Sequence, residues 1–297
     1  MITLLSAPSN LGLRPPQPGA AKAPEALREA GLFSRFAALG ATDSGVVLPG
    51  RYVDDATTRL TGHVRNEVAM VDHARRLAAR IGLAFDRDEA PLVIGGDCSI
   101  LLGAGIASAH RGGIGLVHID GHTDFRHPGN DPESASVAGE DLAAAVGLHW
   151  PAISDIDGYG PYFPAARTAH IGHRDDDGQQ EEARAALGRV APAAEVLSHG
   201  AQRVGAECAA VAGPAYWLQL DVDVLDPSVM PAVDSPDPGG IGAAELTALL
   251  RELAPRAVGA SVTVFDPDLD PDGRYARLLV DVLSEGLHEL GTLTLHT

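Results

Sequence analysis

Apolar residues occur in short runs that are rich in strand-forming residues, and longer amphipathic stretches lie between these runs. The runs that we expect to form strands are 2–6, 91–94, 114–119, 168–172, 194–197, 216–220 and 258–265. The stretches with apolar residues at helical spacing are 25–31, 64–81, 99–110, 181–190, 202–212, 243–253 and 275–290. Because strands and helices alternate, the pattern predicts a mainly parallel sheet that helices cover on both faces.

The predicted fold class is therefore α/β, with three layers in the order helix, sheet, helix. A length of 297 residues suits one large domain, and no repeat or long linker divides the chain, so we expect a single domain over 1–297. Residues 43–62 and 126–139 are rich in Gly, Pro, Asp and Ser, which predicts loops there.

The chain is acidic, with 22 basic and 40 acidic residues and a formal net charge of -18. This balance argues against a nucleic-acid partner, which needs a basic surface to neutralise phosphates. No apolar stretch approaches the roughly 20 residues that span a bilayer, so no membrane partner is expected. The first residues lack the basic region of a signal peptide, and we expect a cytoplasmic protein.

Two acidic motifs directly follow predicted strands. One is Asp-Gly-His-Thr-Asp at 120–124, and the other is Asp-Val-Asp at 221–223. Open α/β sheets place their ligand sites at the carboxyl ends of strands. Carboxylates that converge on one crevice repel one another unless cations neutralise them, and hard divalent cations prefer oxygen ligands with some imidazole. The sequence therefore predicts a metal site at this edge of the sheet.

Each motif alone also has a simpler interpretation. Asp, Gly and Thr are ordinary turn residues, so 120–124 is equally typical of a polar loop. Asp221 and Asp223 favour a metal more strongly, because strand periodicity directs both carboxylates to one face, where they are costly without a counter-ion. Asp226, which precedes a proline, is typical of a turn or cap.

Together with Gly-Gly-Asp-Cys-Ser at 95–99, these motifs resemble the signatures of the ureohydrolase family of arginases, agmatinases and related amidinohydrolases. The family signatures are Gly-Gly-Asp-His-Ser, Asp-Ala-His-x-Asp and Ser-x-Asp-x-Asp-x-x-Asp-Pro. The resemblance covers most of the chain, including 171–175 and 231–240. It implies a three-layer α/β/α fold, two manganese ions (Mn²⁺) bridged by a hydroxide, a small guanidino or amidino substrate, and usually a homotrimer or homohexamer.

The resemblance also implies six metal ligands, which are Cys98, Asp120, His122, Asp124, Asp221 and Asp223. In the family pattern Asp120 and Asp221 bridge the two ions. Asp124 and Cys98 belong to one ion. His122 and Asp223 belong to the other. Two cations held close together lower the pKa of the water that they share, and that water attacks the planar guanidinium carbon.

Cys98 departs from the family pattern, which has a histidine at this position. A thiolate is soft, adds negative charge and weakens Lewis acidity, so an ion there would be softer, weakly held or absent. The alternative is that Cys98 is a small buried apolar side chain, the role that we expect for Cys208 in its Ala-rich helix. Two such cysteines do not indicate an extracellular disulfide scaffold.

A second departure concerns proton transfer. Ala138 stands where the family has a histidine that is proposed to shuttle protons. His127 substitutes for it only if the loop folds back, and the alternative for an exposed loop histidine is simple solvation. Asp124 and His127 are thus the candidate catalytic residues.

The substrate-binding residues depart from the pattern as well. The family carboxylate that pairs with the guanidinium aligns with Val264; Asp266 lies nearby, although a carboxylate before proline normally caps a turn. Arg126 can clamp a carboxylate and Asp177 can hold an ammonium group, which fits an amino-acid-like substrate. The alternative for Asp177 is to cap the following helix. Ser235 lies in the loop where the family often places a small hydroxyl residue near the substrate.

The predicted function is metal-dependent hydrolysis of a linear C–N bond in a guanidino or amidino compound other than plain arginine, such as a substituted guanidine or a formimino compound. One alternative is a non-catalytic arginase-fold protein that binds or regulates. Five of the six ligand positions keep the family's residue types, which disfavours this non-catalytic alternative. The other alternative is an amide deacetylase of related fold, which needs a histidine pair as general base that the sequence does not reveal.

Overall fold

The computed structural model of the chain describes residues 1–14 and 19–294. Within them, eight strands form one sheet in which neighbouring strands are parallel, in the order β2-β1-β3-β8-β7-β4-β5-β6. The strands are β1 (Ile2–Ala7), β2 (Thr42–Val46), β3 (Ala90–Gly95), β4 (Gly115–Ile119), β5 (Thr168–Ile171), β6 (Arg189–Ala191), β7 (Tyr216–Asp221) and β8 (Ala257–Thr263). The prediction of a mainly parallel α/β sheet is confirmed.

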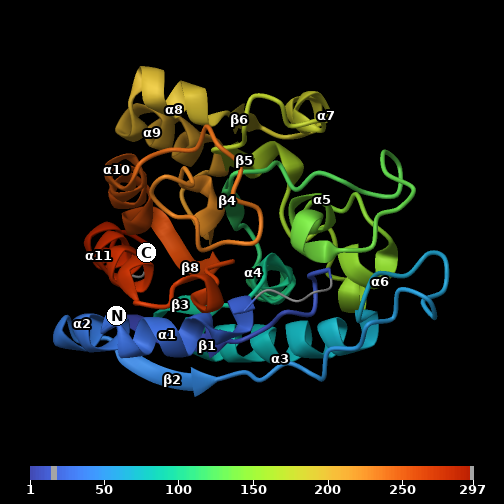
Figure 1. The fold of residues 1–297 in the computed structure, drawn as a ribbon, viewed down its shortest axis with the longest axis horizontal. Coiled ribbons are helices and arrows are strands. Elements are labelled where there is room, and N and C mark those ends of the chain that lie inside the picture. Colours follow the sequence, from blue (N-terminus) through green and yellow to red (C-terminus); the bar gives the residue numbers. More distant parts are fainter. Residues whose placement is uncertain (15–18, 295–297) are drawn as a thin grey trace.

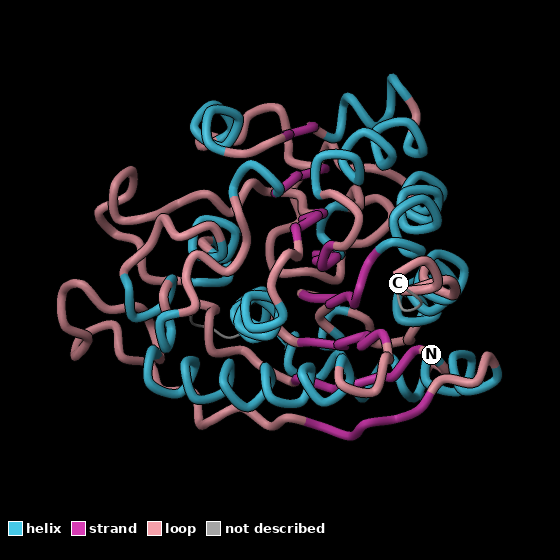
Figure 2. The backbone as a smooth tube through the Cα atoms, turned by 180° about the vertical axis from the view of Figure 1, so that it is seen from behind, coloured by secondary structure: helices cyan, strands magenta, loops and turns pink. Residues whose placement is uncertain are grey.

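Helices flank the sheet on both faces (Figures 1 and 2). They are α1 (Ala23–Glu29), α2 (Leu32–Ala38), α3 (Glu67–Phe85), α4 (Leu101–Arg111), α5 (Asp141–Ala145), α6 (Pro151–Ser154), α7 (Gln180–Ala186), α8 (Ala193–His199), α9 (Ala201–Ala212), α10 (Ala243–Leu253) and α11 (Arg274–Gly286). One apolar core packs α1, α2, α9, α10 and α11 against the sheet, and a second core packs α3, α4 and α5 against it. These two cores complete the three predicted layers.

The apolar pattern explains the central elements. Every residue of β3, β4 and β7 is buried, as expected for parallel strands that helices cover on both sides. In α10 the buried residues are Leu246, Leu249, Leu250 and Leu253, which form one stripe at helical spacing. Among the described residues, no helix has both the length and the hydropathy of a membrane span.

Two predictions of local structure are wrong. Residues 194–197, expected as a strand, lie in α8, and the strand is instead β6, which falls where we expected the end of a helix. Both segments are short and half apolar, so periodicity does not separate them. The chain at 42–46, largely within a predicted loop, forms the edge strand β2. Most of its residues are exposed, so it lacks the apolar signal of a buried strand.

The parallel sheet fixes the position of the site. Because all strands run in one direction, the carboxyl ends of β3, β4 and β7 lie at the same edge. Asp120 continues β4, where its N–H donates to the Ile171 carbonyl of β5 at 3.0 Å. The predicted acidic motifs therefore converge at this edge, as the strand assignments required.

Candidate metal centre

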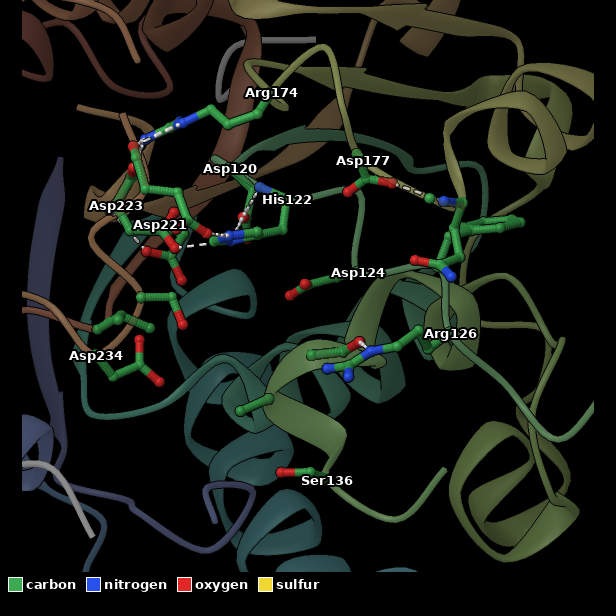
Figure 3. Close-up of a pocket in the computed structure, with 18 of the residues that line it drawn as sticks. Asp120, His122, Asp124, Arg126, Ser136, Arg174, Asp177, Asp221, Asp223 and Asp234 are labelled. Carbon is green, nitrogen blue, oxygen red and sulfur yellow. Dashed lines mark hydrogen bonds and ion pairs between the residues drawn. The ribbon is translucent and has the colours of Figure 1, made fainter. Parts of the chain in front are cut away.

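The side chains that follow β4 and β7 meet at this edge of the sheet (Figure 3). His122 Nδ1 lies 2.9 Å from Asp223 Oδ2 and 3.7 Å from Asp120 Oδ1. Figure 3 shows Asp221 beside Asp223, and Asp124 extending toward the same cavity. The two motifs thus bring together polar side chains from segments that lie roughly 100 residues apart in the sequence.

Local hydrogen bonds hold the carboxylates in place. The Asp120 carboxylate accepts the His122 N–H at 2.7 Å, and the Asp221 carboxylate accepts the Asp223 N–H at 2.8 Å. The Asp223 carboxylate accepts the Gly121 N–H at 2.9 Å. A Cβ on Gly121 would lie 2.8 Å from the Asp223 carbonyl oxygen, so glycine is required for this close approach.

All six predicted ligands occur in groups whose nitrogen, sulfur or oxygen atoms lie within 4.8 Å of one another. The groups are Cys98, Asp120 and Asp221; Cys98, Asp124 and Asp141; His118, Asp120 and Asp124; and Asp120, His122 and Asp223. Asp120 Oδ2 is buried and has no hydrogen-bond partner among the described residues. Such an orphaned carboxylate oxygen among imidazole and carboxylate groups fits a divalent cation such as Mn²⁺.

The electrostatics of the metal-free site show mutual repulsion. Burial raises the pKa of Asp221 well above its usual value, and the charges of Asp223 and Asp120 add to this effect. Burial likewise raises the pKa of Asp124, with Asp120 and Asp141 as the next causes. A bound cation would reverse this cost, because it favours the charged form of each carboxylate.

His122 has the supporting acceptor that the sequence did not identify. Its Nε2 lies 3.1 Å from Asp237 Oδ2, while its Nδ1 faces Asp120 and Asp223. Burial lowers the pKa of His122, but its hydrogen bonds to Asp120 and Asp223 outweigh this effect and raise the pKa above its usual value. A ligating histidine normally donates its second N–H to such an acceptor, so Asp237 fits this role.

The metal-free protein should lose stability as the pH rises through the range in which Asp120 ionises. Burial and Asp223 raise the pKa of Asp120 from 3.8 to about 6. Between these values the folded state binds more protons than the unfolded chain, so the free energy of unfolding falls with rising pH. In chelator, we expect Asp120→Asn to be more stable than the natural protein near pH 8, by on the order of 2 kcal/mol.

Urea unfolding of both proteins near pH 8 and near pH 4 measures this difference. The difference should fall below about 1 kcal/mol near pH 4, where the folded carboxyl group is neutral and the unfolded one is partly ionised, and it should vanish at lower pH. A metal-free Asp120→Asn protein that is less stable than the natural one near pH 8 would contradict the account.

A cavity of about 700 Å³ opens above the candidate ligands. Besides Asp120, His122, Asp124, Asp221 and Asp223, its lining includes Arg126, Ser136, Arg174, Asp177, Asp234, Ser235 and Val264. Three of the predicted substrate-binding residues, Arg126, Asp177 and Ser235, therefore face the same cavity as the ligands.

Arg126 and Asp177 have different surroundings in this cavity. Arg126 is half-buried and makes a long hydrogen bond, 3.4 Å from its Nε to the Gly139 carbonyl oxygen. Asp177 accepts hydrogen bonds from the backbone N–H and the hydroxyl of Thr123, both at 2.8 Å, and from the Gln179 N–H at 2.9 Å. Asp177 therefore fixes Thr123 between two candidate ligands and also caps the turn before α7.

Among the predicted catalytic and substrate-binding residues, His127 and Asp266 lie outside the cavity lining. His127 Nε2 lies 2.9 Å from Glu182 Oε1, and its Nδ1 accepts the Gly129 N–H at 3.0 Å. Both ring nitrogens are thus engaged, one by Glu182 of α7 and the other by the backbone of its own loop, which favours a structural role over proton transfer. Asp266 is buried and accepts the Gly19 N–H at 2.8 Å and the Asp268 N–H at 2.9 Å. These hydrogen bonds are those of a residue that caps a turn, which is the alternative given for Asp266.

Several titratable groups near the site were not predicted from the sequence. Asp234 opens to the cavity, and burial together with Asp223 raises its pKa to about 7. His118 and His170 lie in apolar strands, 3.0 Å apart between their Nδ1 atoms. For these two histidines, an imidazole inside an apolar strand was the available signal. This pair does not line the cavity, so it does not supply the general base that a deacetylase needs.

The fold and the cluster together define a three-layer α/β protein with candidate metal ligands at the carboxyl ends of parallel strands. The model of the Arginase family matches residues 1–288. The chain belongs to this family, and the resemblance predicted from its motifs is confirmed.

Individual relatives agree with this assignment. The arginase of Bacillus caldovelox is 30% identical over 295 residues, which cover 95% of this chain and 96% of the relative. The guanidinopropionase of Pseudomonas aeruginosa is 30% identical over 222 residues, which cover 71% of this chain and 64% of the relative. The native structure of the Bacillus caldovelox arginase superposes with a TM-score of 0.87 at 28% identity and covers 96% of this chain and 97% of that chain.

Proposed function

We propose that this protein is a manganese-dependent hydrolase that cleaves a linear C–N bond of a carboxylate-bearing guanidino or amidino compound. The observation that carries the proposal is the convergence of the ligand-type side chains at one cavity. Relatives named arginase and guanidinopropionase support the substrate class, since both names denote guanidino compounds with a carboxylate.

The ligands of the centre would be Asp120 and Asp221, shared between two ions, with His122 and Asp223 completing one site and Asp124 serving the other. When bound, the two cations supply Lewis acidity and lower the pKa of water. The protein's contribution is to fix the carboxylates by the backbone N–H groups described above, so that the cavity keeps one geometry.

The two ends of the cavity suit the two ends of the proposed substrate. Arg126 is drawn across the cavity from Asp234 in Figure 3, with Asp124 between them. A guanidinium can bind a substrate carboxylate through two hydrogen bonds, which places Arg126 at that end. Asp234 lies beside the ligands and can accept a hydrogen bond from an amidinium group in the ionised form.

The family's guanidinium-binding carboxylate is absent at Val264, and this change favours a substrate other than plain arginine. Val264 lines the cavity with a φ of 73°, and its N–H donates to the Gly96 carbonyl at 2.8 Å. A β-branched residue is strained in this conformation, so the surrounding backbone must hold it there. The result is an apolar wall where the family pattern has a charge, with Asp234 as the nearby replacement.

A substrate screen tests the proposal. The Mn²⁺-saturated protein is incubated with carboxylate-bearing guanidino and amidino compounds, including arginine, and released amine is measured by mass spectrometry. We expect turnover of at least one such compound, faster than that of arginine. No hydrolysis of any amidino compound by a protein that holds two ions would favour the non-catalytic alternative.

Replacing Arg126 by Ala should raise the KM for a carboxylate-bearing substrate by about 10- to 100-fold, the loss expected for hydrogen bonds to a charged group. The same change should leave the KM of the decarboxylated analogue nearly unaffected, because that compound has no group for Arg126 to bind. Steady-state kinetics on the matched pair of substrates measure the difference.

Arg126→Lys is the matched control, since it keeps the charge but loses the bidentate geometry. Its KM should lie between the KM of the natural protein and that of Arg126→Ala. Equal losses for both substrates in Arg126→Ala would show that Arg126 does not recognise the carboxylate.

A further inference from the structure

A second group of ligand-type atoms lies beneath the cavity, behind Asp120 and Asp124. His118 of β4 and Asp141 at the start of α5 are fully buried, and neither lines the cavity. His118 Nε2 lies 3.7 Å from Asp120 Oδ2 and 3.6 Å from Asp141 Oδ1. His118 also forms a group with Asp120 and Asp124 in which the ligand atoms lie within 4.8 Å of one another.

These atoms face one another at ion-pair distances but make no hydrogen bonds within the described part of the chain. Among the described residues, no hydrogen-bond partner exists for His118 Nε2, for Asp120 Oδ2 or for either carboxylate oxygen of Asp141. A buried polar group without a partner costs about 1–3 kcal/mol, and a buried carboxylate costs more. Ligands bound at about 2.1 Å to one ion lie roughly 3–3.5 Å apart. The observed separations are close to this spacing and too long for hydrogen bonds.

The second ring nitrogen of His118 has the partner that a metal ligand requires. His118 and His170 are register partners on the parallel strands β4 and β5, and their Nδ1 atoms lie 3.0 Å apart. One of the two must donate. When His118 donates from Nδ1, its Nε2 lone pair faces Asp120 and Asp141, which is the tautomer that binds a cation.

Cys98 also reaches this cluster, since its Sγ forms one group with Asp124 and Asp141 and another with Asp120 and Asp221, but its thiol is already hydrogen-bonded. Its Sγ donates to Asp221 Oδ2 at 2.8 Å and lies 3.2 Å from Thr263 Oγ1, and the side chain is fully buried. A thiol that donates a hydrogen bond keeps its proton, whereas a cysteine binds a metal as the thiolate. This geometry gives Cys98 a role in orienting Asp221.

We propose that His118 and Asp141, with Asp120 and Asp124, hold the ion that the family pattern assigns to position 98, and that Cys98 only orients Asp221. The imidazole ligand of that ion would then come from β4 and not from the loop after β3. A hard ion then receives nitrogen and oxygen ligands in place of sulfur. The inference rests on the proposed two-ion centre and specifies the ligands of one ion.

Metal analysis of variants tests the relocation without any activity assay. Bound Mn²⁺ per chain is measured by mass-spectrometric metal analysis for the natural protein, His118→Leu, Asp141→Asn and Cys98→Ala, with circular dichroism to confirm folding. We expect two ions in the natural protein and in Cys98→Ala, and one ion in His118→Leu and Asp141→Asn. His170→Asn should keep both ions but bind one of them about 10- to 100-fold more weakly.

A spectrum of the natural protein loaded with Co²⁺ gives a test that needs no variant. A thiolate ligand to Co²⁺ produces an intense near-ultraviolet charge-transfer band, and we expect none. Observation of this band would overturn the relocation while leaving the two-ion centre intact. So would the loss of an ion in Cys98→Ala together with retention of both ions in His118→Leu. Fewer than two ions in the natural protein at saturation would overturn the proposed centre and the relocation together.

Discussion

Asp120→Asn should lower kcat by more than about 100-fold, because loss of even a group that supports a metal ligand costs 10- to 100-fold. Asp120 belongs to three of the four candidate ligand groups, so its charge is needed for both proposed ions. An amide has the same shape but no negative charge, and it cannot replace a bridging carboxylate. Steady-state rates at saturating Mn²⁺ on the substrate found in the screen measure the loss.

Asp72→Asn is a suitable control, since Asp72 is exposed on α3 and pairs with Arg76 at the surface. That variant should keep the natural rate. We expect metal-free Asp120→Asn to be more stable than the natural protein near pH 8, so its inactivity should not come from unfolding. Natural activity in a folded Asp120→Asn protein would remove Asp120 from the centre.

Saturation with Mn²⁺ should raise the midpoint of thermal unfolding by on the order of 10 °C. An ion at 100 times its dissociation constant stabilises the folded state by about 2.7 kcal/mol, and the account has two such ions. For a chain of this size each kcal/mol corresponds to roughly 2–4 °C. The physical source is relief of the burial and charge repulsion that together raise the pKa of Asp124 and of Asp221 in the metal-free protein.

Scanning calorimetry of metal-stripped and Mn²⁺-saturated samples measures this shift. Asp120→Asn provides the internal comparison, because it removes a shared ligand and should lose most of the shift. Identical unfolding midpoints with and without Mn²⁺ in the natural protein would show that these carboxylates do not hold an ion.

The sequence predicted the parts of this fold that carry strong local patterns. Buried strands such as β4 and β7 are continuous apolar runs, and the acidic motif that ends each run marked the functional edge of the sheet. The edge strand β2 escaped prediction because it is polar and exposed, whereas β6 and α8 are too short for their apolar residues to show a period. Tertiary packing decides the structure of such segments.

The residues of the candidate site also divide into those that local sequence patterns predict and those that tertiary contacts bring in. Asp120 and Asp223 follow from spacing along single strands, whereas His118, Asp141 and Asp237 contribute through contacts between elements. Asp237 reaches His122 from a loop more than one hundred residues away. His118 faces Asp141 only because α5 packs over the end of β4. No spacing within the sequence encodes these neighbours, although a histidine within an apolar strand was a visible irregularity.

The most direct test of the central claim is stepwise reconstitution of the metal-stripped protein with Mn²⁺, with ions per chain and hydrolysis of the best amidino substrate measured on the same samples. We expect no turnover without metal and full turnover as occupancy reaches two ions per chain. Turnover that persists without metal, or two bound ions with no hydrolysis of any amidino compound, would contradict it.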